Sequence, residues 1–526
     1  MLIRAVRWFL LVALGSISSG FGQPPVNRLN PAVTRIVDAV SEERIGATMK
    51  KLEGFGSRYI LSDQDSSTRG IGASQRWIFD EFKSYSPRLQ VSLDKFTAKK
   101  GQRIAHDVDL ANVVAVLPGA IDADRFVVIT SHYDSIAARR GPGTPRTDDE
   151  GPRSPQEVEP IAPGVSDNAS GVAAVLELAR IMSQYEFDKS VVFIAFSAEE
   201  VGLVGSAAYA ARARQEKMEI EAVLNNDIIG NDIAGNGRSA NNRLRVFSEG
   251  PEDSPSRSLA RYTKEIAERY IPSMTVDLVF RRDRFGRGGD HTSFNREGYA
   301  AVRLSTPSEN YANQHTAADT LANASVPYAT RVARMNAAVL SSLALAPKPP
   351  IVSRPRLPGR PQRSPETTGN SPAGVSTTAT GSAAGGTTPG TAARPMGPGL
   401  SRGKSGYDAA LRWEMPKPEP DLAGYAIVIR ATTSALWERE TYIGNVTEYT
   451  IPDLSIDDVV IGVKAIDKDD LADITEQDSQ VAVEDPEFGF QAALGMEDIG
   501  GFPQFLQSVH QVQNQGAFQL PVDSNL

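Results

Sequence analysis

The sequence predicts an α/β fold in which a mostly parallel sheet is covered by helices on both faces, followed by a small C-terminal β-sandwich. Two observations lead to this prediction. Between residues 113 and 346, short apolar runs typical of buried parallel strands alternate with segments of helical periodicity. After a long stretch rich in Pro, Gly, Ser and Thr, short strands separated by turn signals return at residue 407, as in a small antiparallel sandwich.

The elements of the main domain follow in order along the chain. Residues 30–85 place apolar side chains at helical spacings, and residues 89–96 alternate apolar and polar residues as a strand does. Helices are also expected over residues 172–182 and between the strand 191–196 and about residue 213. The remaining strands are expected at 112–117, 126–130, 191–196 and 299–304, and one more is expected to end at residues 223–224.

The composition excludes several classes of partner and site. The 526 residues carry a formal net charge of −9 and a pI near 5.4, which argues against a general nucleic-acid-binding protein. There is no cysteine, so disulfides and thiolate-bound metals are excluded. A transition metal would have to be bound by Asp, Glu and a small set of histidines, namely His106, His132, His291, His315 and His510.

The first 22 residues have the pattern of a secretory signal peptide. Arg4 and Arg7 precede an apolar run, residues 8–14, that is too short to span a bilayer. An uncleaved anchor is the alternative. We expect an exported protein, periplasmic or secreted, with no stable membrane insertion after cleavage of the signal.

The rest of the chain divides by composition. Residues 23–346 form the main domain with its N-terminal helical segment, and residues 347–406 read as a flexible linker because they cannot bury enough apolar surface. Residues 407–485 resemble a fibronectin type III domain in the segments 411–413, 423–425 and 463–467, with the first strand alternatively near Ile351–Val352. This domain is expected to bind a protein or a polysaccharide. Residues 486–526 have no strong pattern.

Two adjacent carboxylates, Glu199 and Glu200, follow the buried strand 191–196 directly. Ligands bind outside the carboxyl ends of strands in open α/β sheets. There, one glutamate can bind a metal while its neighbour takes a proton from water. The alternative is an ordinary helix start, where Glu is favoured.

Other strand ends carry the same kinds of side chain. His132 and Asp134 follow the strand 126–130 and point the same way in extended chain, so that the carboxylate can fix the tautomer of the imidazole. Asp167 opens a helix, where an N-cap is the alternative role. Asp227 and His315 follow two later strands. Five potential ligands exceed the need of one open zinc site and suit two metal ions that share a carboxylate.

These segments resemble, in the same order, the M28 family of zinc peptidases. The resemblance covers residues 112–346 and rests on the segments 132–135, 164–171, 199–206, 226–230 and on His315. It implies two Zn²⁺ ions per chain, with Asp167 bridging them. His132 and Asp227 would complete one site, and Glu200 and His315 the other. It also implies that Glu199 is the general base and that Asp134 orients His132.

The chain departs from the family pattern at several positions. Ser166 stands where many relatives have an acidic or amide residue, and Gln314 stands where some have a tyrosine that stabilises the oxyanion. Tyr311 or an arginine between residues 281 and 287 is a candidate substitute. Asp290 and His291 are expected beside the site without being ligands, and the charged insertion at residues 139–161 is expected at its rim.

The function expected from the resemblance is an exported two-zinc exopeptidase, foremost an aminopeptidase acting on peptides or proteins with a free N-terminus. A metal-bound hydroxide would attack the scissile carbonyl, with Glu199 as general base. A carboxypeptidase or a glutaminyl cyclase on the same fold is the first alternative, although a cyclase needs only one zinc. The second is a non-catalytic metal-binding or adhesion scaffold, which the complete set of ligands and Glu199 opposes.

Overall fold

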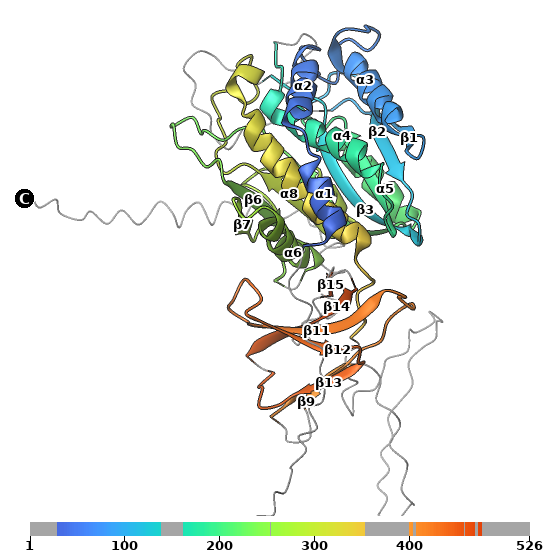
Figure 1. Ribbon diagram of the computed structural model, residues 1–526. Helices are drawn as coiled ribbons and strands as arrows, with labels where there is room; N and C mark the ends of the chain where they lie inside the picture. The colour runs from blue at the N-terminus through green and yellow to red at the C-terminus, as the bar shows by residue number, and fades with distance from the viewer. Residues whose placement is uncertain are drawn as a thin grey trace, which may run out of the picture. The chain divides into compact units, whose positions relative to one another are not determined.

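The largest element of the computed structural model is an eight-stranded sheet (Figure 1). The structure describes residues 29–137, 161–352, 399–402 and 407–475, apart from residues 102, 253, 457 and 469–471. The strands of the sheet are β1 (Gln90–Ala98), β2 (Val108–Leu117), β3 (Asp122–His132), β4 (Lys189–Phe196), β5 (Glu219–Asn226), β6 (Arg243–Ser248), β7 (Thr275–Val279) and β8 (Ala301–Ser305).

The strand order is β1-β2-β4-β3-β5-β8-β6-β7, and the central strands β4, β3, β5 and β8 are parallel to one another. β2 and β6 join this parallel centre in antiparallel pairing on its two sides. All eight residues of β4 are buried, as expected for a central strand covered on both faces. The predicted mostly parallel sheet is therefore confirmed.

Helices cover both faces of the sheet. One face packs against α1 (Pro31–Asp38), α2 (Glu42–Glu53), α3 (Gly70–Tyr85), α4 (Ser170–Met182), α6 (Pro255–Tyr270) and α8 (Val326–Leu345), and the other against α5 (Val204–Gln215) and α7 (His291–Arg296). Two hydrophobic cores result, and successive strand residues alternate between them. Val127 and Ile129 lie in the first core, whereas Val128 lies in the second.

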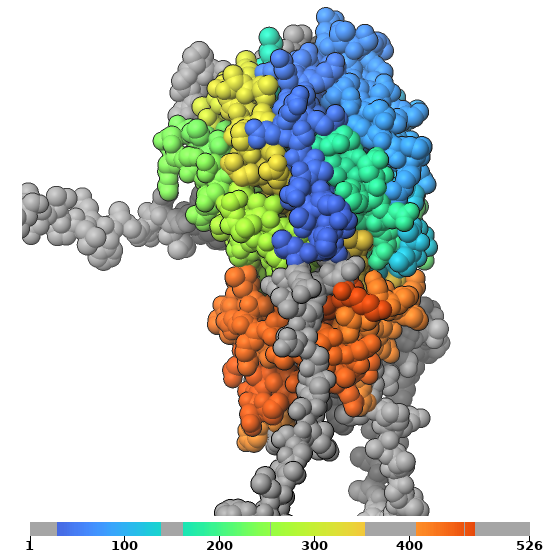
Figure 2. All heavy atoms as spheres, in the orientation of Figure 1, coloured from blue at the N-terminus to red at the C-terminus, as the bar shows by residue number. Residues whose placement is uncertain are grey.

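The N-terminal helices are part of the main domain. Figure 2 shows α1 and α2 (dark blue) on the surface between the segments that contain α8 (yellow) and α4 (green-cyan). Asn30 caps α1 by accepting the main-chain N–H groups of Ala32 and Val33 at 2.8 and 3.2 Å. Pro31 follows at the first helical position, where its missing N–H costs no hydrogen bond.

A buried arginine ties this N-terminal segment to two loops at the edge of the sheet. The Arg58 guanidinium, fully buried, donates to the main-chain carbonyls of Tyr133 at 2.6 Å and Gly164 at 2.9 Å, and also to that of Pro163. It also donates to the main-chain carbonyl of Leu52 at the end of α2, at 3.1 Å. Because a buried guanidinium without partners is very costly, this arrangement holds the loops after β3 and before α4 in one position.

The C-terminal part contains two small antiparallel sheets. One consists of β9 (Gly399–Arg402), β10 (Ala409–Arg412) and β13 (Glu448–Ile451), and the other of β11 (Leu422–Ala431), β12 (Arg439–Gly444), β14 (Val459–Asp467) and β15 (Ala472–Thr475). They share one buried cluster, in which the rings of Trp413 and Tyr425 meet edge to face with centroids 5.3 Å apart.

Several sequence-based boundaries change. Residues 399–402, assigned above to the linker, form β9, and Ile351 makes an isolated bridge to Glu414. Three elements that follow β5, namely β6, α6 and β7, were not predicted from the sequence. The predicted signal peptide, residues 138–160, most of the linker and the C-terminal tail lie outside the described residues. Within the described part, no helix is long and apolar enough to cross a membrane.

Candidate metal centre

The carboxyl ends of the central strands bring the predicted site residues together. His132 is the last residue of β3, Glu199 and Glu200 lie in the turn after β4, and Asp227 follows β5. Asp167 lies in the segment Val165–Ala169 that precedes α4, where its own main chain is not helical (φ −118°, ψ 89°), and His315 lies in the loop after β8. The five predicted ligands are at most 9% exposed.

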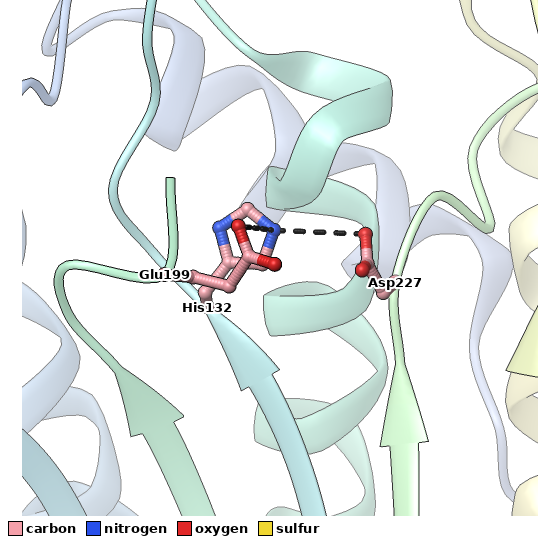
Figure 3. A group of neighbouring side chains, drawn as sticks. All are labelled: His132, Glu199 and Asp227. Atoms are coloured by element: carbon pink, nitrogen blue, oxygen red, sulfur yellow. Dashed lines mark ion pairs between the residues drawn. The ribbon is translucent and has the colours of Figure 1, made fainter. Parts of the chain in front are cut away.

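His132 forms the centre of a first group of side chains. Its Nε2 atom lies 3.2 Å from Asp167 Oδ1, 3.6 Å from Asp227 Oδ1 and 4.0 Å from Glu199 Oε2. Figure 3 shows that His132, Glu199 and Asp227 reach toward one another from three neighbouring strand ends. Candidate ligand atoms of these three residues all lie within 4.8 Å of one another.

His315 forms a second group on the other side of Asp167. Its Nε2 atom lies 3.1 Å from Asp167 Oδ2 and 3.1 Å from Glu200 Oε1. The two oxygens of Asp167 therefore face different histidines. A carboxylate shared in this way between two His-carboxylate groups is the arrangement that a two-metal site requires.

The donor set and its hydrogen bonding fit metal ions. His132 donates its Nδ1–H to the main-chain carbonyl of Asp134 at 3.1 Å, which leaves the Nε2 lone pair directed at the carboxylates. His132 Nε2 and Glu200 Oε1 are buried and make no hydrogen bond to any described group. Imidazole and carboxylate ligands without thiolate suit zinc.

The electrostatics of the group also favour bound cations. Burial alone would lower the pKa of His315, but Glu200 and Asp167 raise it to about 9. Burial would raise the pKa of Asp167, whereas His132 and His315 hold it well below its usual value. Burial, together with the carboxylates of Asp227 and Glu200, raises the pKa of Glu199 well above its usual value, although His132 opposes this. An excess of buried negative charge is thus concentrated where cations would lie.

Asp134 has a different contact from the one expected. Its carboxylate lies 3.6 Å from His132 Nδ1, too far for a hydrogen bond, and the ring is oriented by the Asp134 main-chain carbonyl instead. The carboxylate accepts the main-chain N–H groups of Glu199 and Glu200, each at 3.2 Å. Asp134 therefore orients His132 through its main chain and the two glutamates through its side chain.

Two residues that support the ligands were missed by the sequence analysis. The Asp319 carboxylate accepts the main-chain N–H groups of Ser166 at 2.7 Å and Asp167 at 3.1 Å. The fully buried Arg303 places its Nε 3.0 Å from Asp227 Oδ2. A signal was present for Arg303, because an arginine inside an apolar strand must find a buried partner.

The main chain around the ligands is held in the left-handed region. Ala198, directly before Glu199, has φ 62°, Ile228, directly after Asp227, has φ 62°, and His315 has φ 56°. A β-branched residue such as Ile228 is rarely found in this conformation. Unfavourable main-chain geometry of this kind clusters at functional sites, where the surrounding structure maintains it.

The two simpler interpretations of the motifs are wrong. Asp167 makes no N-cap hydrogen bond, since α4 begins at Ser170. Glu199 and Glu200 do not start a helix either, because α5 begins only at Val204. The start of α4 approaches the end of β5 closely, since a Cβ added at Gly171 would lie 2.7 Å from the main-chain oxygen of Asn226.

Comparison with known proteins agrees with this geometry. The sequence model of peptidase family M28 matches residues 112–340. A "Probable zinc metalloprotease" of Pyricularia oryzae is 34% identical over 462 residues, which cover 81% of this chain and 80% of the relative. The chain belongs to peptidase family M28. The M28 match contains every predicted ligand and Glu199.

Solved structures resemble this M28 chain at lower identity. The aminopeptidase LapA of Legionella pneumophila is 20% identical, with a TM-score of 0.46, over 66% of this chain and 81% of that one. The glutaminyl cyclase of Fimbriiglobus ruber is also 20% identical, with a TM-score of 0.43, over 57% of this chain and 95% of that one. These likenesses do not distinguish between activities.

Removing the Asp319 carboxylate is predicted to weaken metal binding. The Asp319→Ala variant leaves two main-chain N–H groups beside Asp167 without their acceptor, so Asp167 loses its fixed orientation. Residues that orient metal ligands typically contribute about 10–100-fold to affinity. We expect a loss of this size when zinc is titrated against a chromogenic chelator. Asp80→Ala, at an exposed position of α3, is the control and should bind zinc normally. Unchanged affinity in a folded Asp319→Ala protein would contradict the assigned role.

Proposed function

We propose that this chain is an exported two-zinc aminopeptidase. The observation that carries the proposal is the Asp167 carboxylate, whose two oxygens face His132 and His315 separately. The curated relative named a probable zinc metalloprotease supports zinc as the metal, and the M28 family supports peptide substrates. The pattern of residues 1–22 supports export, to the periplasm or the medium.

The ligands divide between two ions. His132 and Asp227 would hold one zinc, Glu200 and His315 the other, and Asp167 both. When bound, zinc supplies a Lewis acid that polarises the scissile carbonyl and lowers the pKa of a water molecule. Asp134, Asp319 and Arg303 keep the ligands in place by the contacts described above.

Glu199 is the proposed general base. It lies at the edge of the first group, with Oε2 4.0 Å from His132 Nε2, and its raised pKa suits a group that accepts a proton and later donates it. It would take the proton of the attacking water and deliver it to the leaving amine. The adjacent Glu200 faces His315, so the two glutamates have separate tasks.

The same carboxylates favour a substrate with a free α-amine. Glu199 and Asp227 lie beside one another at the first group and would pair with an ammonium ion. A glutaminyl cyclase needs one zinc, and two complete groups of ligands oppose it. A non-catalytic scaffold would have no use for Glu199.

The C-terminal sheets belong to a separate proposed role. Their buried Trp413 and antiparallel strands support a fibronectin type III-like sandwich that docks on a protein or polysaccharide. The ligands and Glu199 all precede residue 347, so peptide hydrolysis itself is assigned to the main domain.

The proposed activity is tested with matched peptides. We expect the zinc-loaded protein to hydrolyse Leu-Ala-amide and to lose most of this activity on acetyl-Leu-Ala-amide, since acetylation removes the ammonium ion. A chelator should abolish hydrolysis, and added zinc should restore it. Equal rates on the free and acetylated peptides would instead indicate an endopeptidase or a carboxypeptidase.

The roles of the two glutamates are tested by paired substitutions. Glu199→Gln keeps the size of the side chain but cannot accept a proton, so kcat should fall by about 10²–10⁴-fold with zinc content unchanged. Glu200→Gln should lose zinc affinity, and excess zinc should partly restore its activity. Zinc analysis and kcat for both variants decide the question. If Glu199→Gln loses zinc while Glu200→Gln keeps it and is inactive, the two roles are reversed.

A further inference from the structure

A surface cleft opens between the two loops that carry Asp227 and His315. It has a volume of about 420 Å³ and is lined by residues 234–236 of the first loop, by Arg245 of β6, and by Pro307, Glu309, Tyr311 and Ala312 of the second loop. The loops are joined where the main-chain N–H of Thr306 donates to the carbonyl of Ile228 at 2.9 Å. The two loops that form most of the cleft wall are therefore the loops that carry Asp227 and His315.

Arg245 gives the cleft an uncompensated positive charge. Its side chain is half-buried, and no described carboxylate lies within ion-pair distance of it. Arg243, two residues earlier on the same strand, differs in this respect, because it is paired with Asp277 at 2.5 Å and does not line the cleft. A half-buried guanidinium without a counter-charge is poorly solvated and gains from an anionic ligand.

The one carboxylate in the cleft wall is already neutralised. Glu309 is 6% exposed, and its Oε2 atom lies 2.6 Å from Nη1 of Arg284. Arg284 in turn contacts Asp283 at 3.0 Å, which pairs with Arg303, the residue that holds Asp227. These alternating charges pair with one another and hold the inner wall of the cleft in place. Arg245 is therefore the charged group of the cleft wall that can bind a ligand.

The apolar part of the wall fits the carbon chain of a peptide ligand. Pro307 lines the cleft, and the Tyr311 ring is 37% exposed at its rim. Tyr311 precedes His315 by four residues, so a ligand in the cleft lies beside the loop that delivers a predicted metal ligand. The cleft thus combines one cation with a short apolar wall.

We propose that the cleft binds a carboxylate of the peptide substrate through Arg245, so that substrates with negative charge close to the scissile bond are preferred. The proposal rests on the proposed peptidase function and names its substrate class. The carboxylate has two possible sources, an acidic side chain of the N-terminal residue or the free C-terminus of a dipeptide. Both offer the guanidinium the same paired oxygens.

Two pairs of peptides separate the sources. Glu-Ala-amide against Gln-Ala-amide isolates the side-chain carboxylate, and Ala-Ala against Ala-Ala-amide isolates the terminal carboxylate. A charged hydrogen bond between Arg245 and the substrate carboxylate should raise kcat/KM roughly 10-fold or more. We therefore expect the acidic peptide to be preferred by this factor over its neutral counterpart in at least one of the two comparisons. In Arg245→Met that ratio should fall to about 1, while the rates on the neutral peptides stay unchanged.

The control is Arg243→Met, which removes a charge from the same strand outside the cleft and should keep the wild-type ratios. Ratios near 1 for both pairs in the wild type, or ratios that survive Arg245→Met, would overturn the proposal.

Calorimetry of the four peptides with the zinc-loaded Glu199→Gln protein tests carboxylate binding in the cleft separately from the peptidase activity. If none of the four peptides is hydrolysed, the peptidase function fails, and calorimetry still decides about the cleft. Tighter binding of an acidic peptide that is lost in the Glu199→Gln, Arg245→Met double variant supports the cleft, and equal binding of all four peptides rejects it.

Discussion

The structure depends on the concentration of buried negative charge at one edge of the sheet. Asp167, Glu199, Glu200 and Asp227 lie within a few ångströms of two imidazoles and are largely withdrawn from water. Such a group is stable only if cations or well-placed donors compensate it. Most features of the surrounding loops follow from this requirement, because His132, Asp167, Glu200 and Asp227 are each held by a partner that is itself buried.

The compensating partners come from distant parts of the chain. Arg303 of β8 pairs with Asp227, and Asp319 binds the main-chain N–H groups beside Asp167. Arg58, from the N-terminal segment, fixes the loop that follows His132 and the loop that precedes Asp167 by binding the carbonyl groups of Tyr133 and Gly164. The α/β architecture supplies the ligands at one edge, and these partners set their orientation. Peptide hydrolysis requires both the ligands and their correct orientation, since a small misplacement of a catalytic group lowers the reaction rate strongly.

Much of this site could be predicted from the sequence, because its ligands follow apolar strands whose buried pattern is unambiguous. His132, Glu199 and Asp227 were found in this way, and the parallel order of β4, β3 and β5 brings them together. What could not be predicted depends on contacts between residues far apart in the chain. The side chain of Asp134 was expected to bind His132 but binds the main chain of the glutamates, because the strand ends at His132 and the chain turns. β6 was not predicted, because it pairs antiparallel with β8 and lacks the continuous apolar run by which the central parallel strands were recognised.

The central claim is that Asp167 is shared by two metal ions. Anomalous diffraction at the zinc absorption edge, from crystals of the zinc-loaded protein, tests it most directly. We expect two peaks, one between Asp167, His132 and Asp227 and the other between Asp167, Glu200 and His315, roughly 3.5–4 Å apart as in other two-metal sites. A single peak at full zinc occupancy, or two peaks of which one lies away from Asp167, would contradict the account.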